Sequence, residues 1–594
     1  MSVLDTPRIY FRGQITWDPI TNNNWSPFYD VSTSKPELCR GTVADYRERA
    51  RQAILPLPGN WNVHGTHRST FFETIVTGVD LGHGLQDHDA LEGVPVLFTG
   101  KLVDLEPYGT TTSQLFFDEL SCGIQGGSQI LAHRAGPIVA RRINVARNTG
   151  YHYIAGGASV IWQASFPTDG GLLVQPHGSA VLADLQYLLS HDDDVAGLTV
   201  RFNTYRTVYY GIKTPTTRQA RALANRIAQG GFHPNPARSL IVGVIGLWRK
   251  GEAPSVPGDR VLARAVGSPV GTAFAKVGDG RLTIDLSNSI PETSFAMAKL
   301  NLGPLTVVAK AEGDDVELGT LEYAAYDTAA YQATSGIVTL PPLDPARAAA
   351  AGAADLEVRA ADRTVLLTEQ PLTVVADPPN LYLEEGEQAS VSLRAFLRGG
   401  RPGAPVSVTI VQVGGVFTPL QVQTNLPPPQ VQTNEAGTVT IPINGGKAGS
   451  WTWMLVPRRG DTAPTPPPSL DPDLNEYVVL RITPADDKIA NLEPTWENVH
   501  HYVLRDWEAL APCMDNWLRL GDKQQCQTYA GLIRRLTSPE RFNDYGYMPV
   551  TRDLTRGQRT LLHAWCDAVT ESVTTRAILG AEDVAEKDPF GRGF

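Results

Sequence analysis

The sequence predicts a mainly β protein that ends in a small all-α module. Gly (55) and Pro (44) together make up 99 of the 594 residues, about a sixth against an average of roughly 12 %, which indicates many turns. Over most of the chain, short runs of β-branched and aromatic residues end at Gly, Pro, Asn or Asp, as strands do. From about residue 494 the apolar spacing changes to the period of a helix.

Residues 1–375 are expected to form antiparallel barrels or sandwiches, in one or two domains, because the predicted strands follow one another with few helices between them. Two helices are predicted, over 45–55 and 217–228, and the alanines at 348–351 are assigned to a polar connection. The predicted strands cover residues 74–79, 96–103, 158–164, 198–209, 239–248, 281–286 and 305–310.

Residues 376–485 are predicted to be an immunoglobulin-like β-sandwich. A turn at 377–380 comes before the strands. Even spacing of short alternating strands, separated by turns rich in Gly and Asn, is typical of that architecture. The predicted strands lie at 390–396, 406–413, 438–443, 450–456 and 478–482.

Residues 490–594 are predicted to be a helical module. The first apolar stripe steps by three and four residues, as one face of a helix does. A second stripe runs over 526–536, and a third helix is expected after Thr555, which is a suitable N-cap. The first stripe consists of Trp496, Val499, Val503, Trp507 and Leu510.

Charge and composition exclude several classes of protein. Lys and Arg number 51 against 62 Asp and Glu, a net charge of −11. General binders of nucleic acid or of anionic membranes carry a basic field, so neither partner is expected. The five scattered cysteines fit a reducing compartment. The N-terminus has charged residues where a signal peptide is apolar, and the longest strongly apolar stretch, 240–248, is too short to cross a bilayer. A cytoplasmic protein is expected.

The sequence lacks the motifs of the common enzyme classes. It has no Gly-x-Ser-x-Gly elbow and no Gly-x-x-x-x-Gly-Lys-Ser/Thr phosphate loop. It also lacks Cys-x-x-Cys and His-Glu-x-x-His, so zinc fingers and zinc proteases are not supported. No catalytic residue is assigned.

Histidines are concentrated near the N-terminus. Four of the twelve fall within 25 residues, at His64, His67, His83 and His88. Two imidazoles three residues apart can share a metal when a turn folds them together. This pattern predicts that His64 and His67 bind a cofactor and that His83 and His88 bind a metal. The alternative is a solvated loop, because Gly and Asp surround these histidines.

Two other clusters were weighed as sites. Three successive carboxylates at 192–194 could bind a divalent cation, but a corner between a helix and a strand also explains them. His500, His501 and His563 could meet in the helical core and ligate iron. Ordinary packing is the preferred interpretation for both clusters.

Five stretches, read in chain order, resemble one family. They resemble the N-terminal half of the bacterial enzymes that couple two indole-3-pyruvate imines, namely the imine dimer synthase of the violacein pathway and the chromopyrrolate synthases of the rebeccamycin and staurosporine pathways. The stretches are 4–13 (LDTPRIYFRG), 192–200 (DDDVAGLTV), 242–251 (VGVIGLWRKG) with 257–262 (PGDRVL), 380–384 (NLYLE), and 526–530 (CQTYA) with 547–554 (YMPVTRDL).

The resemblance implies oxidative chemistry on imines derived from amino acids, and it suggests haem, which some members of the family contain, as a candidate cofactor. It also implies that the catalytic ferritin-like half of these enzymes lies outside this chain. The first hypothesis is therefore a biosynthetic subunit that acts with a separately encoded ferritin-like protein or amino-acid oxidase. The second is a non-catalytic binding or scaffold protein, and the third is a self-sufficient haem or metal enzyme. A homo-oligomer is compatible with all three.

Overall fold

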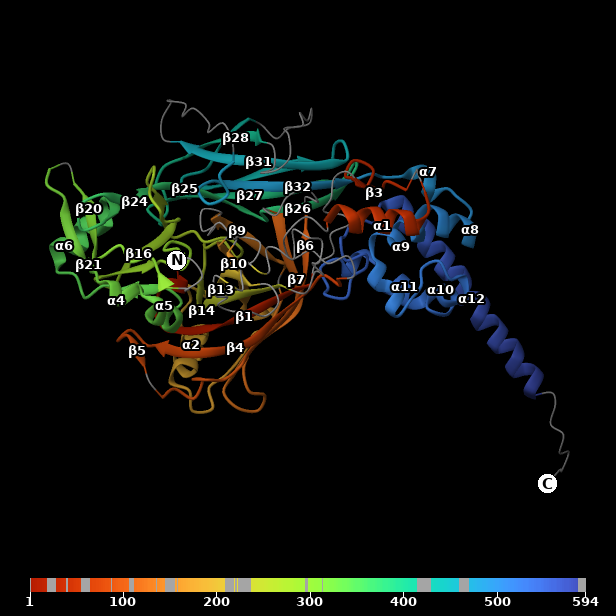
Figure 1. Ribbon diagram of the computed structural model, residues 1–594, viewed down its shortest axis with the longest axis horizontal. Helices are drawn as coiled ribbons and strands as arrows, with labels where there is room; N and C mark the ends of the chain where they lie inside the picture. The colour runs from red at the N-terminus through yellow and green to blue at the C-terminus, as the bar shows by residue number, and fades with distance from the viewer. Residues whose placement is uncertain are drawn as a thin grey trace, which may run out of the picture.

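The computed structural model describes residues 2–18, 28–38, 41–54, 65–86, 88–105, 112–134, 136–144, 155–156, 159–208, 218, 222, 237–293, 298–311, 313–413, 429–458 and 470–585. Within these residues the protein is mainly β, with antiparallel and barrel-like sheets (Figure 1). The helix predicted over 217–228 lies outside the described residues, apart from 218 and 222. No described helix is long and apolar enough to span a membrane.

The N-terminal β region is built on a sheet that closes on itself. Its strands follow the order β12-β8-β7-β6-β4-β1-β14-β13-β11-β9, and a further pairing of β7 with β9 joins the two arms of the sheet. The strands are β1 (Arg8–Asp18), β4 (Arg68–Asp80), β5 (Leu85–Gln86), β6 (Val96–Asp104), β7 (Ser113–Gly123), β8 (Gln129–His133), β9 (Ile138–Asn144), β10 (Ala155–Gly156), β11 (Ser159–Pro167), β12 (Leu173–Gln175), β13 (Val195–Val208) and β14 (Ala237–Arg249).

Aromatic side chains fill the inside of this barrel. Phe71 contacts Phe98 and Phe202, with ring centroids 5.1 and 5.2 Å apart. Gly243 on β14 faces Phe11 on β1, and a Cβ at Gly243 would lie 2.2 Å from the Phe11 ring. A glycine is therefore required there for close packing. The short elements η1 (Ser2–Leu4), η6 (Thr168–Gly170) and α2 (Ala180–His191) lie along the barrel sequence.

A second antiparallel sheet follows the barrel, in the order β21-β20-β23-β24-β15-β16-β17-β22. The buried Arg201 of β13 joins barrel and sheet, because its guanidinium lies 2.7 Å from Asp259 and 3.2 Å from Asp285. The elements are β15 (Arg260–Arg264), β16 (Ala273–Gly278), β17 (Arg281–Asp285), β18 (Glu292–Thr293), β19 (Ala298–Lys299), β20 (Leu305–Lys310), β21 (Val316–Leu321), α4 (Tyr323–Tyr326), α5 (Thr328–Thr334), β22 (Ile337–Thr339), α6 (Pro345–Ala353), β23 (Asp355–Arg359) and β24 (Val365–Gln370).

The prediction of a connection at 348–351 is wrong, because these alanines lie inside α6. The Asp344 side chain accepts a hydrogen bond from the Arg347 N–H and caps the helix, and Pro345 occupies its first turn. Ala has the highest helix propensity of all residues, so cap and composition together form a helix.

Two sheets over 372–483 enclose one hydrophobic core. One has the order β25-β27-β30 and the other β26-β32-β31-β28-β29. The pair β26–β32 is parallel, an exception to the antiparallel arrangement expected from the sequence. The strands are β25 (Leu372–Asp377), β26 (Asn380–Glu384), β27 (Gln388–Leu397), β28 (Ser407–Val413), β29 (Gln430–Gln432), β30 (Thr438–Asn444), β31 (Gly449–Arg458) and β32 (Glu476–Thr483).

Helices follow the last strand, and an N-terminal segment joins their core (Figure 1). Tyr29, Val31 and Tyr46 are buried in the same cluster as Trp507 and Trp565. The helical core is thus built from two distant parts of the chain. Its elements are β2 (Tyr29–Asp30), β3 (Lys35–Pro36), α1 (Val43–Ile54), α7 (Asp487–Ala490), α8 (Trp496–Val499), η8 (His500–Leu504), α9 (Arg505–Leu510), η9 (Pro512–Asn516), α10 (Lys523–Thr528), α11 (Ala530–Leu536), η10 (Pro539–Arg541) and α12 (Arg556–Ala585).

Candidate functional site

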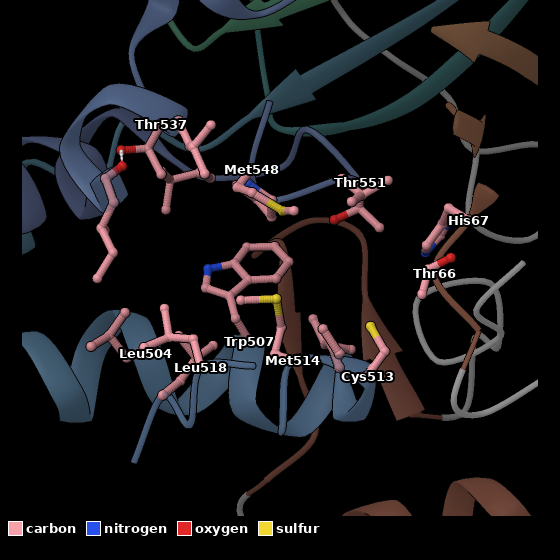
Figure 2. A pocket seen from close by; sticks show the side chains of 18 of the residues that line it. Thr66, His67, Leu504, Trp507, Cys513, Met514, Leu518, Thr537, Met548 and Thr551 are labelled. Atoms are coloured by element: carbon pink, nitrogen blue, oxygen red, sulfur yellow. Dashed lines mark hydrogen bonds between the residues drawn. The ribbon is translucent and has the colours of Figure 1, made fainter. Parts of the chain in front are cut away.

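A cavity of about 250 Å³ lies where the helices meet the ends of barrel strands β4 and β6 (Figure 2). Most of its walls are apolar, which is usual for sites that bind small organic molecules. We call it the Trp507 cavity. It is lined by Thr66, His67, Lys101, Leu504, Trp507, Leu510, Ala511, Cys513, Met514, Asn516, Trp517, Leu518, Leu520, Ile533, Leu536, Thr537, Met548, Pro549, Val550, Thr551, Leu554 and Leu562.

The barrel side of the cavity holds His67 in a fixed orientation. The Leu102 N–H donates to the His67 carbonyl (2.7 Å), and Nδ1 of His67 lies 2.8 Å from the Leu102 carbonyl oxygen. This extends the pairing of β4 with β6, in which Arg68 faces Lys101. The His67 backbone has φ of +59°, a left-handed conformation that costs energy in most residues. One residue, Leu102, thus fixes both the backbone and the ring of His67.

The imidazole of His67 is neutral at physiological pH. Burial lowers its pKa to about 4, and the nearby charges of Lys101 and Arg552 act in the same direction, while the hydrogen bond to Leu102 raises it. A carbonyl oxygen can only accept, so Nδ1 carries the proton and Nε2 keeps its lone pair. The structure records no hydrogen bond to Nε2 from the residues that it describes.

The helical side of the cavity places Trp507 in the wall. The helix is continuous from α8 through the π-turn η8 to α9, and π-turns inside helices are frequent at functional sites. Trp507 is 7 % exposed, and its Nε1 is buried without a hydrogen-bond partner among the described residues. Figure 2 shows the indole between Met514 and Met548. Trp451 and Trp453 also have an unpartnered Nε1, but neither lines this cavity.

Two cations lie at the His67 end of the cavity. The Lys101 ammonium donates to the Thr66 carbonyl (2.9 Å) and lies 5.0 Å from the centre of the Tyr545 ring. Arg552 follows the lining residue Thr551 and is almost fully buried. These positive charges favour an anion at this end.

Arg552 is held by neutral groups. Its guanidinium donates to the carbonyls of Phe542 (3.2 Å) and Asp544 (2.9 Å) and lies 3.5 Å from the centre of the Phe116 ring. Burial lowers the pKa of Arg552 to about 10. Within the described residues it forms no ion pair with a carboxylate, so its charge is only partly compensated.

The wall that carries Thr551 and Arg552 is anchored at both ends. The buried Asp553 accepts a hydrogen bond from the Tyr29 hydroxyl, and burial raises the pKa of its carboxyl. Thr555 and Gln558 form a capping box at the start of α12, with two reciprocal bonds of 3.2 Å. The Thr555 prediction is therefore confirmed.

These features define what the cavity can hold. A flat apolar ring can pack against its walls. The cationic end suits a carboxylate, and Nε2 of His67 can accept a proton.

The predicted histidine site is only partly described. His64 lies outside the described residues, and His67 lies in the cavity wall. His83 and His88 are exposed, and neither lines the cavity. The described residues contain no cluster of three or more His, Cys, Asp or Glu suited to a metal. The cofactor role of His64 and His67, and the metal role of His83 and His88, stay predictions.

Ordinary packing agrees with the surroundings of the two other clusters, the carboxylates at 192–194 and the histidines of the helices. Asp192 and Asp194 lie 2.8 and 3.4 Å from Arg249, at the corner between α2 and β13. His500 Nε2 lies 3.3 Å from Glu508. His563 Nε2 lies 2.8 Å from the Thr537 hydroxyl, which itself donates to the Ile533 carbonyl.

The sequence did not single out Trp507, Lys101 or Arg552 as site residues. The apolar stripe that includes Trp507 predicts its burial correctly, but it gives no information about the hydrogen bonding of its N–H. Arg552 lies in the stretch 547–554, which contributed to the family resemblance. That stretch is the signal that could have identified this wall, although its motif was interpreted as structural.

Comparisons with known proteins give one informative relative. No family model matches the chain. The 2-imino-3-(indol-3-yl)propanoate dimerase of Chromobacterium violaceum is 25 % identical over 630 residues, which cover 93 % of this chain and 56 % of the dimerase. The chain thus spans about half the length of the curated relative that it matches.

Solved structures add no argument about the fold. An α-2-macroglobulin from Escherichia coli is 8 % identical and covers 82 % of this chain and 29 % of its own, and one from Salmonella is 12 % identical and covers 81 % and 28 %. Both have a TM-score of 0.13, too low to indicate a shared fold. The match to the imine dimerase shows that this chain is a distant relative of its N-terminal part.

Proposed function

We propose that the Trp507 cavity binds an aromatic 2-imino acid and that this chain is the substrate-binding part of an imine-coupling enzyme. The observation that carries this proposal is an apolar cavity, walled by Trp507, that has Lys101 in its lining and the buried Arg552 next to the lining residue Thr551. The name of the relative includes an indole-bearing 2-imino acid.

The volume of the cavity agrees with the ring of such a ligand. An apolar cavity of about 150 Å³ binds benzene. By proportion, about 250 Å³ accommodates roughly ten ring atoms, which is the size of an indole. The haem that the resemblance implies has about forty non-hydrogen atoms, and by the same proportion it does not fit this cavity.

The cationic end agrees with the other half of the ligand. The carboxylate of a 2-imino acid would lie toward Lys101 and Arg552, where its charge offsets theirs. The ring would pack against Leu504, Leu518 and Met548. Binding would thus fix which end of the molecule faces His67.

Coupling two imines removes two electrons, so an oxidant must act with this chain. We propose that a ferritin-like protein or an amino-acid oxidase is the partner, as the resemblance implies. Co-purification of the tagged chain with such candidates tests it, and a failure of every candidate to bind contradicts it.

The finer architecture is part of the same proposal. We place a β-rich region at 1–375, an immunoglobulin-like sandwich at 376–485 and a helical module at 490–594, in a cytoplasmic protein. Separate hydrophobic cores in the sandwich sheets and in the helices support this division. The contribution of Tyr29 and Tyr46 to the helical core indicates that the helices need the N-terminal segment to fold.

A cavity-filling variant tests the binding proposal. Indole-3-pyruvate, the stable 2-oxo counterpart of the imine, is titrated into the protein by calorimetry. We expect binding to the wild type and its loss in Leu518→Trp, which fills the cavity. Leu97→Trp is the matched control, because Leu97 is 54 % exposed on β6 and lies outside the lining. Equal affinity in all three proteins would contradict the proposal.

A further inference from the structure

We propose that His67 is the proton-transfer group of the Trp507 cavity and converts a bound aromatic 2-imino acid into its enamine. This inference rests on the proposed function and gives that site a chemical step. It assigns a catalytic role to the His67 side chain alone. The cofactor role predicted for His67 differs, because it needs a bound cofactor as well.

Geometry selects His67 from the polar groups of the cavity. Its ring is fixed by the Nδ1–H bond to Leu102 (2.8 Å), and within the described residues Nε2 has no recorded partner. The Thr537 hydroxyl donates to the Ile533 carbonyl (2.9 Å), and the Thr551 hydroxyl donates to Asp553. Lys101 is a cation whose ammonium donates to Thr66. A neutral imidazole with a free lone pair is the group suited to accept a proton.

The reaction balances without an oxidant. Nε2 of His67 takes a proton from C3 of the imino acid, and the C3–H electron pair forms the C2=C3 double bond. The former C2=N π pair moves to nitrogen, which then takes the proton back from the imidazolium. C3 and the imine nitrogen are both bonded to C2, so one base can reach both. The product is the enamine, whose C3 is a carbon nucleophile for coupling.

The charges around His67 support this step. Burial is the main cause of the lowered pKa of His67, and Lys101 and Arg552 lower it further. The carboxylate of a bound substrate offsets the contribution of the two cations, so the ring becomes a better base when substrate is present. The same two cations stabilise the negative charge that develops on nitrogen as the proton leaves C3.

Deuterium exchange measures the step directly. Indole-3-pyruvate undergoes the same shift, with oxygen in place of nitrogen. It is incubated with the full chain in D₂O, and loss of its C3 proton signal is followed by NMR against a protein-free sample. We expect the wild type to accelerate exchange. His67→Asn should lower the protein-dependent rate at least tenfold while calorimetric binding persists, because Asn tolerates the left-handed backbone.

A His→Asn substitution at another residue with positive φ is the matched control. His177 also has a positive φ (+34°) but is exposed and lies outside the lining. We expect His177→Asn to retain both exchange and binding. Protein-dependent exchange that persists in His67→Asn overturns the inference and leaves the proposed function intact. Binding without any acceleration by the wild type also overturns it, whether or not the variant folds. Absence of binding by the wild type overturns both.

Discussion

Two buried indole N–H groups are hydrogen-bonded inside the barrel, whereas the Trp507 N–H at the cavity has no partner among the described residues. In the barrel, Trp17 donates to Ser239 (2.8 Å) and Trp162 donates to Thr204 (3.2 Å). Arg201 meets two carboxylates. At the cavity, no described residue accepts from the Trp507 N–H, and Arg552 is held by carbonyls and rings.

This difference separates a structural role from a binding role. A buried donor without a hydrogen bond costs about 1–3 kcal/mol, and Trp17 and Trp162 avoid this cost through their bonds inside the barrel. Trp507 keeps a comparable cost in the cavity wall. Residues of one type, Trp or Arg, therefore have different expected sensitivities in the two regions.

The largest effect is expected from the two arginines. Arg201→Met leaves Asp259 and Asp285 buried without their guanidinium and should lower the free energy of unfolding by about 3–5 kcal/mol. Arg552→Met removes hydrogen bonds to carbonyls and should cost about 1–3 kcal/mol, while it weakens binding of indole-3-pyruvate. Urea unfolding and calorimetry measure the two quantities. A larger stability loss for Arg552→Met would contradict the comparison.

The next effect concerns the two indoles. Trp507→Phe replaces the indole in the cavity wall by a smaller ring, so it should weaken binding of indole-3-pyruvate about 3- to 10-fold, which corresponds to ~1 kcal/mol. Trp162→Phe removes a bond already made to Thr204, so it should lower stability by about 1 kcal/mol more than Trp507→Phe does. Calorimetry and urea unfolding are run on both variants. Unchanged affinity in Trp507→Phe would refute the role of the indole in binding.

The two regions should also respond to pH with opposite signs. Burial raises the pKa of Asp506, beside Trp507, to about 7. The folded state then holds the proton more tightly than the unfolded state, so stability falls as pH rises from about 4 to 7. In the barrel, burial alone would raise the pKa of Asp80, but Arg8 and the Gly82 and Gly84 N–H groups outweigh burial and lower it. That stability is present above the unfolded pKa and is lost in acid.

Asparagine substitutions at Asp506 and Asp80 test the two predicted pH dependences. Asp506→Asn should stabilise the protein, relative to the wild type, more at pH 8 than at pH 5. The difference in the free energy of unfolding should be on the order of 1–2 kcal/mol. Asp80→Asn should lower it at both pH values, because it breaks the 2.6 Å pair with Arg8. Urea unfolding at the two pH values measures both. Parallel pH profiles for the two variants would show that burial does not set the behaviour of Asp506.

The elements that could be predicted are those with a local signal. β14 and β31 have long β-branched or alternating runs, and the structure has strands there. α6 was missed because its alanines were interpreted as a connection, although its Asp344 cap and Pro345 are visible in the sequence. The packing of α1 against the C-terminal helices has no local signal, because it joins segments more than 400 residues apart.

The candidate site could be predicted only in part for a similar reason. His67 was selected because histidines are dense around it, which says nothing about its bond to Leu102. That bond depends on the register of β4 with β6. The positive charge of Lys101 and Arg552 at one end of the cavity depends on a contact between the barrel and a loop that lies 450 residues further along. Periodicity and motifs do not report such contacts.

The smallest effect is expected at the exposed histidines. His83 lies between Gly82 and Gly84, whose N–H groups donate to Asp80 (2.8 and 3.1 Å), so the turn does not depend on the imidazole. His88 has φ of +76°, which Asn tolerates. Without metal, His83→Ser combined with His88→Asn should change the free energy of unfolding by less than about 0.5 kcal/mol. The metal prediction is confirmed if Zn²⁺ raises the Tm of the wild type and not of the variant, because a ligand stabilises only the state that binds it. An equal Tm shift in both proteins would contradict it.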